Sequence, residues 1–174
     1  CGQAWSMLSR LYANIHALDI PGFDNPLDHA FEYAQRGVRL EPNNQRSRGI
    51  LAYVYLFRDE ITAGLAEVEK ALSLNPNCLF IVDGLGYLMT LMGQWAQGTA
   101  LIRSVIRLNP YYGTYVHYAL WVDWLRQGKR KDAYLETLHL NQPSPYWDNL
   151  ARAASLGLFG RIQEGEQAAA KLLT

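Results

Sequence analysis

Histidines and clustered acidic residues are the side chains of this sequence that could bind a metal ion or move a proton. The histidines are His16, His29, His117 and His139. None pairs with another at the i, i+4 spacing, with a carboxylate between them, that a zinc-peptidase helix requires. We therefore expect these dispersed histidines to lie at the surface or between helices. Asp19, Asp24 and Asp28 do not follow the spacing of a calcium-binding loop, so the sequence predicts no metal site.

Cysteine and glycine-rich segments offer no better candidate for catalysis. Cys78 follows Asn77, which we expect to cap a helix, and a helix N-terminus can lower the pKa of a thiol. No base stands beside Cys78 in the sequence, so we expect an unreactive thiol. The run DGLG at 83–86 resembles a phosphate-binding loop, but it is expected inside a helix rather than between a strand and a helix. We predict a chain that is not an enzyme and needs no cofactor.

The elements that carry these residues repeat along the chain. Pro42, Pro76 and Pro110 are 34 residues apart, and each closes a similar run: GVRLEP, ALSLNP and VIRLNP. A period of this length is typical of a solenoid of helix–turn–helix units. Within 79–110, apolar residues at helical spacing on both sides of Gly93 predict two short antiparallel helices.

The same plan predicts five helix pairs in one domain over residues 1–174, which we expect to be part of a longer protein. The approximate repeats are 2–42, 45–76, 79–110, 114–145 and 146–174. The first is divergent and has a long joint, DIPGFDN, after which Asn25 and Pro26 are expected to start the second helix. The turns of the other four are expected at Arg58 and Asp59, Gly93, Gly128 and Gly160, and the helix at 163–174 is expected to end the chain.

These repeats resemble the tetratricopeptide repeat (TPR) family. The residues that carry the resemblance are Trp5, Leu8, Ser9 and Tyr12 in the first copy, Leu51, Ala52, Tyr55, Ala71 and Pro76 in the second, and Leu85, Gly86 and Pro110 in the third. The resemblance implies an all-α, TPR-type solenoid of antiparallel helix pairs in a right-handed superhelix. Trp121 departs from the pattern, because the family has a small residue there where helix backbones approach.

The order of the repeats carries a second resemblance. A divergent first pair, two regular repeats, one stretched by a residue after LNPYYGTYV, and a short last repeat are similar to the C-terminal repeat region of bacterial class III adenylate or guanylate cyclases and related transcriptional regulators. This resemblance implies that a catalytic or DNA-binding domain lies outside the chain.

Composition excludes some classes of partner. Sixteen basic residues balance sixteen acidic ones, so nucleic acid and anionic membranes are not expected partners. No apolar stretch reaches the roughly 18 to 20 residues that span a bilayer. Cys1 and Cys78 are too few for a disulfide framework, which favours a reducing, cytoplasmic location.

In the TPR family, the first helix of each repeat lines a concave groove, and the resemblance implies which residues face it here. They are Arg10, Asn14, Arg46, Tyr53, Leu56, Phe80, Asp83, Tyr87, Tyr115, Tyr118, Val122, Trp147 and Leu150. The set is rich in aromatic residues, which are favoured at interfaces; alternatively, some of them fill space between repeats. It lacks the Lys and Asn pattern with which related proteins hold a chaperone's terminal carboxylate.

The sequence thus favours a module that binds a protein or peptide segment in this groove, from a separate protein or from another domain of the same chain, as the regulatory part of a bacterial signalling protein. The alternative is self-association, for example as a homodimer, because the ending AAAKLLT adds no polar helix to cap the last repeat. The basic run RQGKRK at 126–131 is expected to be a solvated turn, with contact to an acidic partner as its alternative.

Overall fold

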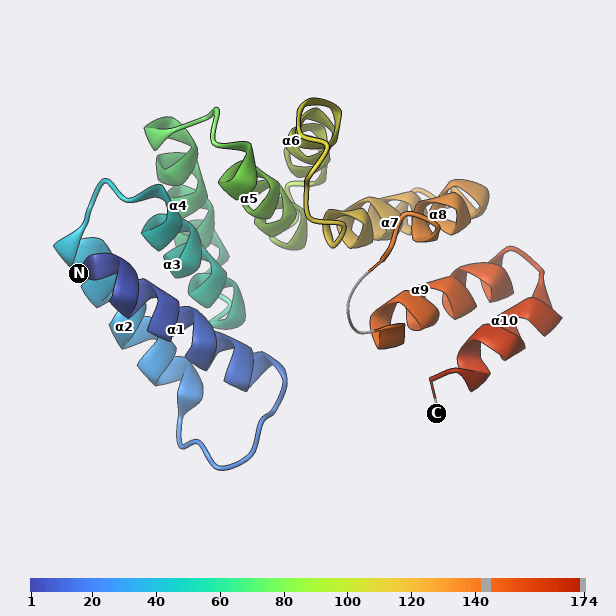
Figure 1. Ribbon diagram of the computed structural model, residues 1–174, viewed down its shortest axis with the longest axis horizontal. Helices are drawn as coiled ribbons and strands as arrows, with labels where there is room; N and C mark the ends of the chain where they lie inside the picture. Colours follow the sequence, from blue (N-terminus) through green and yellow to red (C-terminus); the bar gives the residue numbers. More distant parts are fainter. Residues whose placement is uncertain (142–144, 173–174) are drawn as a thin grey trace. The chain divides into compact units, whose positions relative to one another are not determined.

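A computed structural model describes residues 1–141 and 145–172, and all the regular secondary structure in these ranges is helical (Figure 1). The helices are α1 (Gly2–Ala17), α2 (Pro26–Leu40), α3 (Gln45–Phe57), α4 (Ile61–Leu74), α5 (Leu79–Leu91), α6 (Trp95–Leu108), α7 (Val116–Arg126), α8 (Arg130–Thr137), α9 (Pro145–Leu158) and α10 (Ile162–Ala170). They form antiparallel pairs, as the period predicts. The chain divides into two compact units, Cys1–Pro110 and Tyr111–Thr174.

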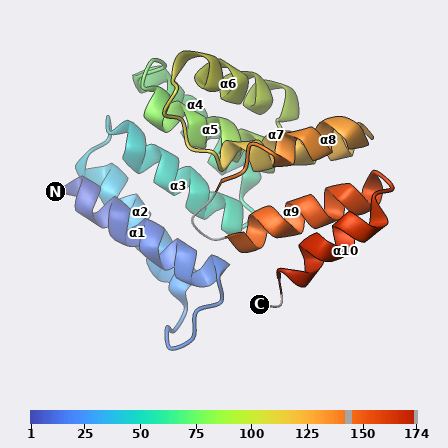
Figure 2. The same ribbon diagram turned by 45° about the vertical axis from the view of Figure 1, so that its right-hand side comes forward.

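Within the first unit, the first helix of each helix pair packs against both helices of the preceding pair. Helix α3 packs against both α1 and α2, and α5 packs against both α3 and α4 (Figure 2). Two clusters of buried side chains fill these joints. In one, Leu51 and Val54 of α3 pack on Ala34 of α2. In the other, Leu85 and Leu88 of α5 join α3 and α4 residues, so the core is built joint by joint.

Small residues let the two helices of a pair approach closely. A Cβ atom added at Gly98 of α6 would lie 2.6 Å from the carbonyl oxygen of Gly86 in α5. The first pair shows the same contact in another form: Ser9 of α1 donates a hydrogen bond of 2.6 Å to the carbonyl oxygen of Ala30 in α2. The small position predicted at Ser9 and Gly86 is therefore where neighbouring backbones meet.

The turns lie where the sequence places them. Gly93, Gly128 and Gly160 have φ of 86°, 72° and 88°, a backbone region that glycine adopts with the least strain. Asp59 takes the same role with φ of 58°.

The predicted helix starts have two outcomes. Asn25 and Pro26 start α2 as predicted. The prediction for Asn77 is wrong, since Cys78 is the N-cap of α5. The backbone N–H of Asn77 instead donates to the Oδ1 atom of Asn75, which organises the turn one residue earlier.

The second unit departs more from the regular plan. Helix α8 has only 8 residues, and Trp121 stands at the small position of α7. Its indole Nε1–H donates a hydrogen bond of 2.7 Å to Ser155 Oγ of α9, so the large ring is used to join two helix pairs. Helix α10 ends at Ala170, earlier than the predicted helix at 163–174, of which 173–174 lie outside the described residues.

Among the described helices, none is both long enough and apolar enough to cross a lipid bilayer.

Candidate protein-binding face

Eight of the thirteen residues predicted to face a groove lie in the first unit, on α1, α3 and α5. We call this set the α1/α3/α5 face. It consists of Arg10, Asn14, Arg46, Tyr53, Leu56, Phe80, Asp83 and Tyr87. The three helices are successive first helices of their pairs and pack in the order α1, α3, α5, so residues at equivalent places on them come together.

Tyr53 is the centre of this face. Its hydroxyl donates a hydrogen bond of 3.0 Å to Asn14 Oδ1, which joins α3 to α1. Burial raises the pKa of Tyr53, and the nearby positive charge of Arg10 partly opposes the rise. The phenol therefore stays protonated at neutral pH and remains a hydrogen-bond donor. The ring also packs on both buried clusters of the unit, so Tyr53 has a role in the core as well.

Tyr87 occupies the equivalent place on α5. Burial raises the pKa of its phenol, and Tyr53 raises it further, so the two phenols are near enough to interact electrostatically. The structure thus brings the predicted tyrosine pair together on adjacent helices.

The outer part of the face is formed by Phe80 and Arg46. The ring of Phe80 is 71% exposed, among the most exposed large apolar side chains described. The guanidinium carbon of Arg46 lies 5.7 Å from the ring centroid, a distance at which a cation still attracts an aromatic face. Two other members are less accessible, since Leu56 packs on the buried cluster that contains Leu85 and Asp83 is itself buried.

The five remaining predicted residues lie in the second unit and do not form one group there. Tyr115 is the N-cap of α7, and the Tyr118 hydroxyl donates a hydrogen bond to Asp148 of α9. Val122 is partly exposed. Trp147 is about half exposed and meets the ring of Tyr146 edge-to-face, with centroids 5.3 Å apart. Leu150 lies on a different surface, in a hollow between α9 and α10.

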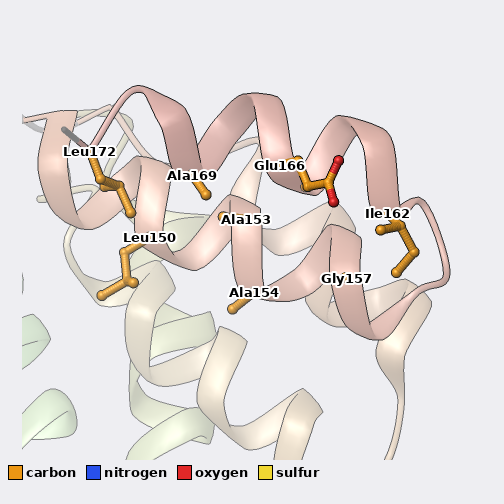
Figure 3. A pocket seen from close by; sticks show the side chains of 9 residues that line it. Leu150, Ala153, Ala154, Gly157, Ile162, Glu166, Ala169 and Leu172 are labelled. Carbon is orange, nitrogen blue, oxygen red and sulfur yellow. The ribbon is translucent and has the colours of Figure 1, made fainter. Parts of the chain in front are cut away.

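That hollow is a second surface of interest, which sequence reasoning missed. It is lined almost wholly by small and apolar side chains, such as Ala153 of α9, Ala169 of α10 and Leu172 just after α10 (Figure 3). Among the described residues that line it, Glu166 is the one with a charge. The spacing of the small residues on both helices is the signal that could have indicated it.

A buried polar network in the second unit was also missed. His117 is buried, and its Nδ1 atom lies within hydrogen-bonding distance of Glu136. Its Nε2 atom lies 3.0 Å from the Tyr112 hydroxyl. The ring of His117 stacks on His139 with centroids 4.9 Å apart, so these two histidines are not dispersed in space.

Glu136 is the acceptor at the centre of the network. The indole Nε1–H of Trp124 donates to its other carboxylate oxygen at 3.0 Å. Burial raises the pKa of Glu136, but the hydrogen bonds from His117 and Trp124 outweigh this effect and hold the pKa below its usual value. Over residues 1–141 and 145–172, no three His, Cys, Asp or Glu side chains gather as a metal site would require.

Comparisons with known proteins agree on the fold. No family model matches the sequence, and no curated protein matches it significantly. Solved structures do match. A thermophilic TPR protein of Thermus thermophilus, TTC0263, has a TM-score of 0.75 at 19% identity, covering 99% of this chain and 90% of that one.

Two further structures show the same similarity. A structure described as MamA AMB-1 has a TM-score of 0.66 at 16% identity, covering 97% of this chain and 95% of that one. YrrB, described as a TPR protein with an unusual peptide-binding site, has a TM-score of 0.57 at 13% identity, covering 95% and 83%. Identities this low establish architecture rather than activity. With its antiparallel helix pairs and recurring close contacts, the chain has the all-α, TPR-type solenoid fold.

Proposed function

We propose that the chain is a non-catalytic interaction module that binds a peptide or protein segment on the α1/α3/α5 face. The observation that carries the proposal is the grouping of Arg10, Asn14, Tyr53 and Tyr87 on three helices. Helix α5, which carries Tyr87, also carries the mostly exposed Phe80. A fixed set of phenols and one open ring suits recognition of an extended or helical segment with an apolar anchor.

The comparisons support this proposal at the level of fold. YrrB is described as having a peptide-binding site, and the TPR architecture places successive first helices side by side in our first unit too. The face is also free of the features of an active site, because its titratable groups are two tyrosines kept protonated, two arginines and a buried aspartate.

The second unit carries its own candidate contacts. Tyr115, Tyr118, Val122, Trp147 and Leu150 lie at the start of α7, on α7 and on α9. We propose that those with exposed side chains, Trp147 above all, contact a protein or peptide partner within that unit.

The proposed setting is a larger bacterial signalling protein of the cyclase type, working in the cytoplasm, in which the module regulates another domain. The order of the repeats is its only support. The full-length open reading frame tests it: a cyclase or winged-helix domain encoded upstream supports the proposal, and an unrelated domain there refutes it.

The binding experiment uses a selected ligand, because the partner is not identified. A phage-displayed random peptide library is selected on the 174-residue chain, and the recovered peptides are titrated by calorimetry into the wild type and into a Phe80→Ala/Tyr87→Ala variant. Loss of an aromatic anchor at an interface centre costs about 2 kcal/mol or more, or roughly 30-fold in Kd. We avoid Tyr53→Ala here because that ring also packs in the core.

A Tyr111→Ala variant is the matched control, since this tyrosine is 89% exposed and lies outside the α1/α3/α5 face. We expect the control to bind like the wild type and the double variant to lose about 30-fold or more, with circular dichroism unchanged. Equal affinity of all three proteins would exclude this face as the binding site.

A further inference from the structure

Two exposed apolar surfaces, one near each end of the described chain, resemble the two sides of the contact by which one helix pair packs on the next. One is the hollow between α9 and α10. The other is a stripe on α1 formed by Ala4, Met7, Leu8 and Leu11, which we call the α1 stripe. Residues at 4, 7, 8 and 11 share one face of a helix.

The hollow is equivalent, position by position, to the surface of α3 and α4 that holds α5. The two helix pairs align at their turns, Gly160 with Asp59, and at their close contacts, Gly165 with Gly64. In this alignment Ala153 corresponds to Ala52, Ala169 to Val68, and Leu172 to Ala71. All three residues of the earlier pair belong to the cluster that buries Leu85 and Leu88 of α5.

Other residues of the hollow follow the same rule. Ile162 corresponds to Ile61 and Ala154 to Tyr53, and both of these earlier residues pack against the α5 cluster. The hollow therefore has the shape of a seat for the first helix of another helix pair. In the described chain that seat is open, and Ile162 is 56% exposed.

The α1 stripe is equivalent to the side chains that fill such seats. Leu8 corresponds to Leu51 of α3 and to Leu85 of α5, a register fixed by the neighbouring small residues Ser9, Ala52 and Gly86. Leu51 and Leu85 are 5% and 1% exposed because each is pressed into the preceding pair, whereas Leu8 is 36% exposed.

The next turn repeats the contrast. Leu11 corresponds to Val54 and Leu88, which are 0% and 8% exposed, whereas Leu11 is 55% exposed. Helix α1 thus exposes to solvent residues whose equivalents on α3 and α5 are buried against the preceding helix pair.

Charge agrees with the match of shapes. Helix α1 carries Arg10 and no acidic residue. The hollow carries Glu166 and no basic residue among those that line it. Arg10 lies beside the α1 stripe, next to Leu11 in the sequence, and Glu166 lies in the hollow, so the pairing brings together two charges of opposite sign, whereas contact between two identical surfaces would bring together like charges.

We propose that the chain associates head to tail, with the α1 stripe of one copy seated in the α9/α10 hollow of a second copy. Such an interface joins two different surfaces, so each copy keeps one free half and further copies can add to the chain. One helix in one seat buries a small area, and the association is accordingly weak and reversible.

Analytical ultracentrifugation tests the proposal with two single variants of the 174-residue chain. Leu11→Glu places a carboxylate in the α1 stripe, and Ala169→Glu places one in the centre of the hollow. Wild-type protein is expected to rise in weight-average mass from monomer past dimer, without a plateau, between about 10 µM and about 1 mM, the range in which weak interfaces fill. Each variant alone is expected to remain monomeric.

Mixing the two variants gives the deciding result. The Leu11→Glu protein keeps an intact hollow and the Ala169→Glu protein keeps an intact stripe, so their 1:1 mixture is expected to form dimers and nothing larger. This recovery also shows that both variants are folded. Gln3→Glu on α1 and Gln167→Glu on α10 are matched controls, since they add the same charge outside the two surfaces, and both should associate like the wild type.

Three results would overturn the proposal. The first is a wild-type chain that is monomeric over the whole range. The second is continued association of the Ala169→Glu variant alone, which would show that the hollow is not used. The third is a mixture that stays monomeric although wild type associates, which would indicate an interface between two identical surfaces.

Discussion

Replacing Gly98 by alanine tests how closely α5 and α6 must approach. The new methyl group would lie 2.6 Å from the carbonyl oxygen of Gly86 and 2.8 Å from the backbone nitrogen of Thr90. Both are backbone atoms and cannot move alone, so the helices must separate. Overpacking of this kind costs about 1–3 kcal/mol, while alanine in place of glycine returns about 0.5–1 kcal/mol of helix propensity. Contacts this short with backbone atoms place the cost in the upper part of that range, about 2–3 kcal/mol, so we expect a net loss of about 1–2.5 kcal/mol.

Two other glycines calibrate that value. At Gly86, an added Cβ atom would lie 3.1 Å from the Gly98 carbonyl oxygen and from Leu101 Cβ. Because this contact is milder, we expect the free energy of unfolding of Gly86→Ala to lie between that of Gly98→Ala and that of Gly157→Ala. At Gly157 of α9, nothing lies within 4 Å, and Gly157→Ala should gain about 0.5–1 kcal/mol.

Urea unfolding followed by circular dichroism measures the series, with equal m values showing that only stability has changed. The expected order of stability is Gly157→Ala, wild type, Gly98→Ala. A Gly98→Ala variant as stable as the wild type would refute the close contact between α5 and α6.

Two further predictions concern a turn and a buried carboxylate. Asp59 and Gly93 hold equivalent turns with positive φ, so Asp59→Gly should raise the free energy of unfolding and Gly93→Asp should lower it, each by about 1 kcal/mol; changes of the same sign in urea unfolding would contradict this reasoning. The pKa of Glu136 is lower in the folded chain than in the unfolded chain, so its stabilising effect is complete above the unfolded value of about 4.3 and is lost as the pH falls through the folded value. Wild type should therefore lose more stability than Glu136→Gln between about pH 5 and pH 3, measured by thermal unfolding, and parallel losses would show that the carboxylate network does not contribute.

The parts of the fold that local sequence dictates were predictable. Glycine at 93, 128 and 160 indicates a turn because only glycine adopts positive φ at little cost, and each turn lies there. Small residues at 9 and 86 likewise indicated where helices meet. Asp59 was placed at a turn by the period rather than by its own preference, which shows that the repeat carries information that a single residue does not.

What the sequence did not predict depends on contacts between distant residues. Cys78 rather than Asn77 is the N-cap residue of α5, and the backbone N–H of Asn77 donates a hydrogen bond to Asn75. The pairing of His117 with Glu136 joins α7 to α8, and no spacing rule within one helix reveals it. For the α1/α3/α5 face, the resemblance to the TPR family indicated which residues share a side, while the partial burial of Tyr53 in the core could be seen only once the helices were packed.

The joint-by-joint packing of the first unit also bears on how fast it folds. Its main packing contacts join helices that are neighbours or next neighbours along the chain, such as α1 with α3 and α3 with α5. A chain whose contacts are this local closes mainly short loops on its way to the native state, so we expect it to fold in microseconds to milliseconds, as helical proteins of low contact order do. Any helix pair can nucleate the process, and the unfolded interval in which the apolar seats stand open to aggregation is correspondingly brief.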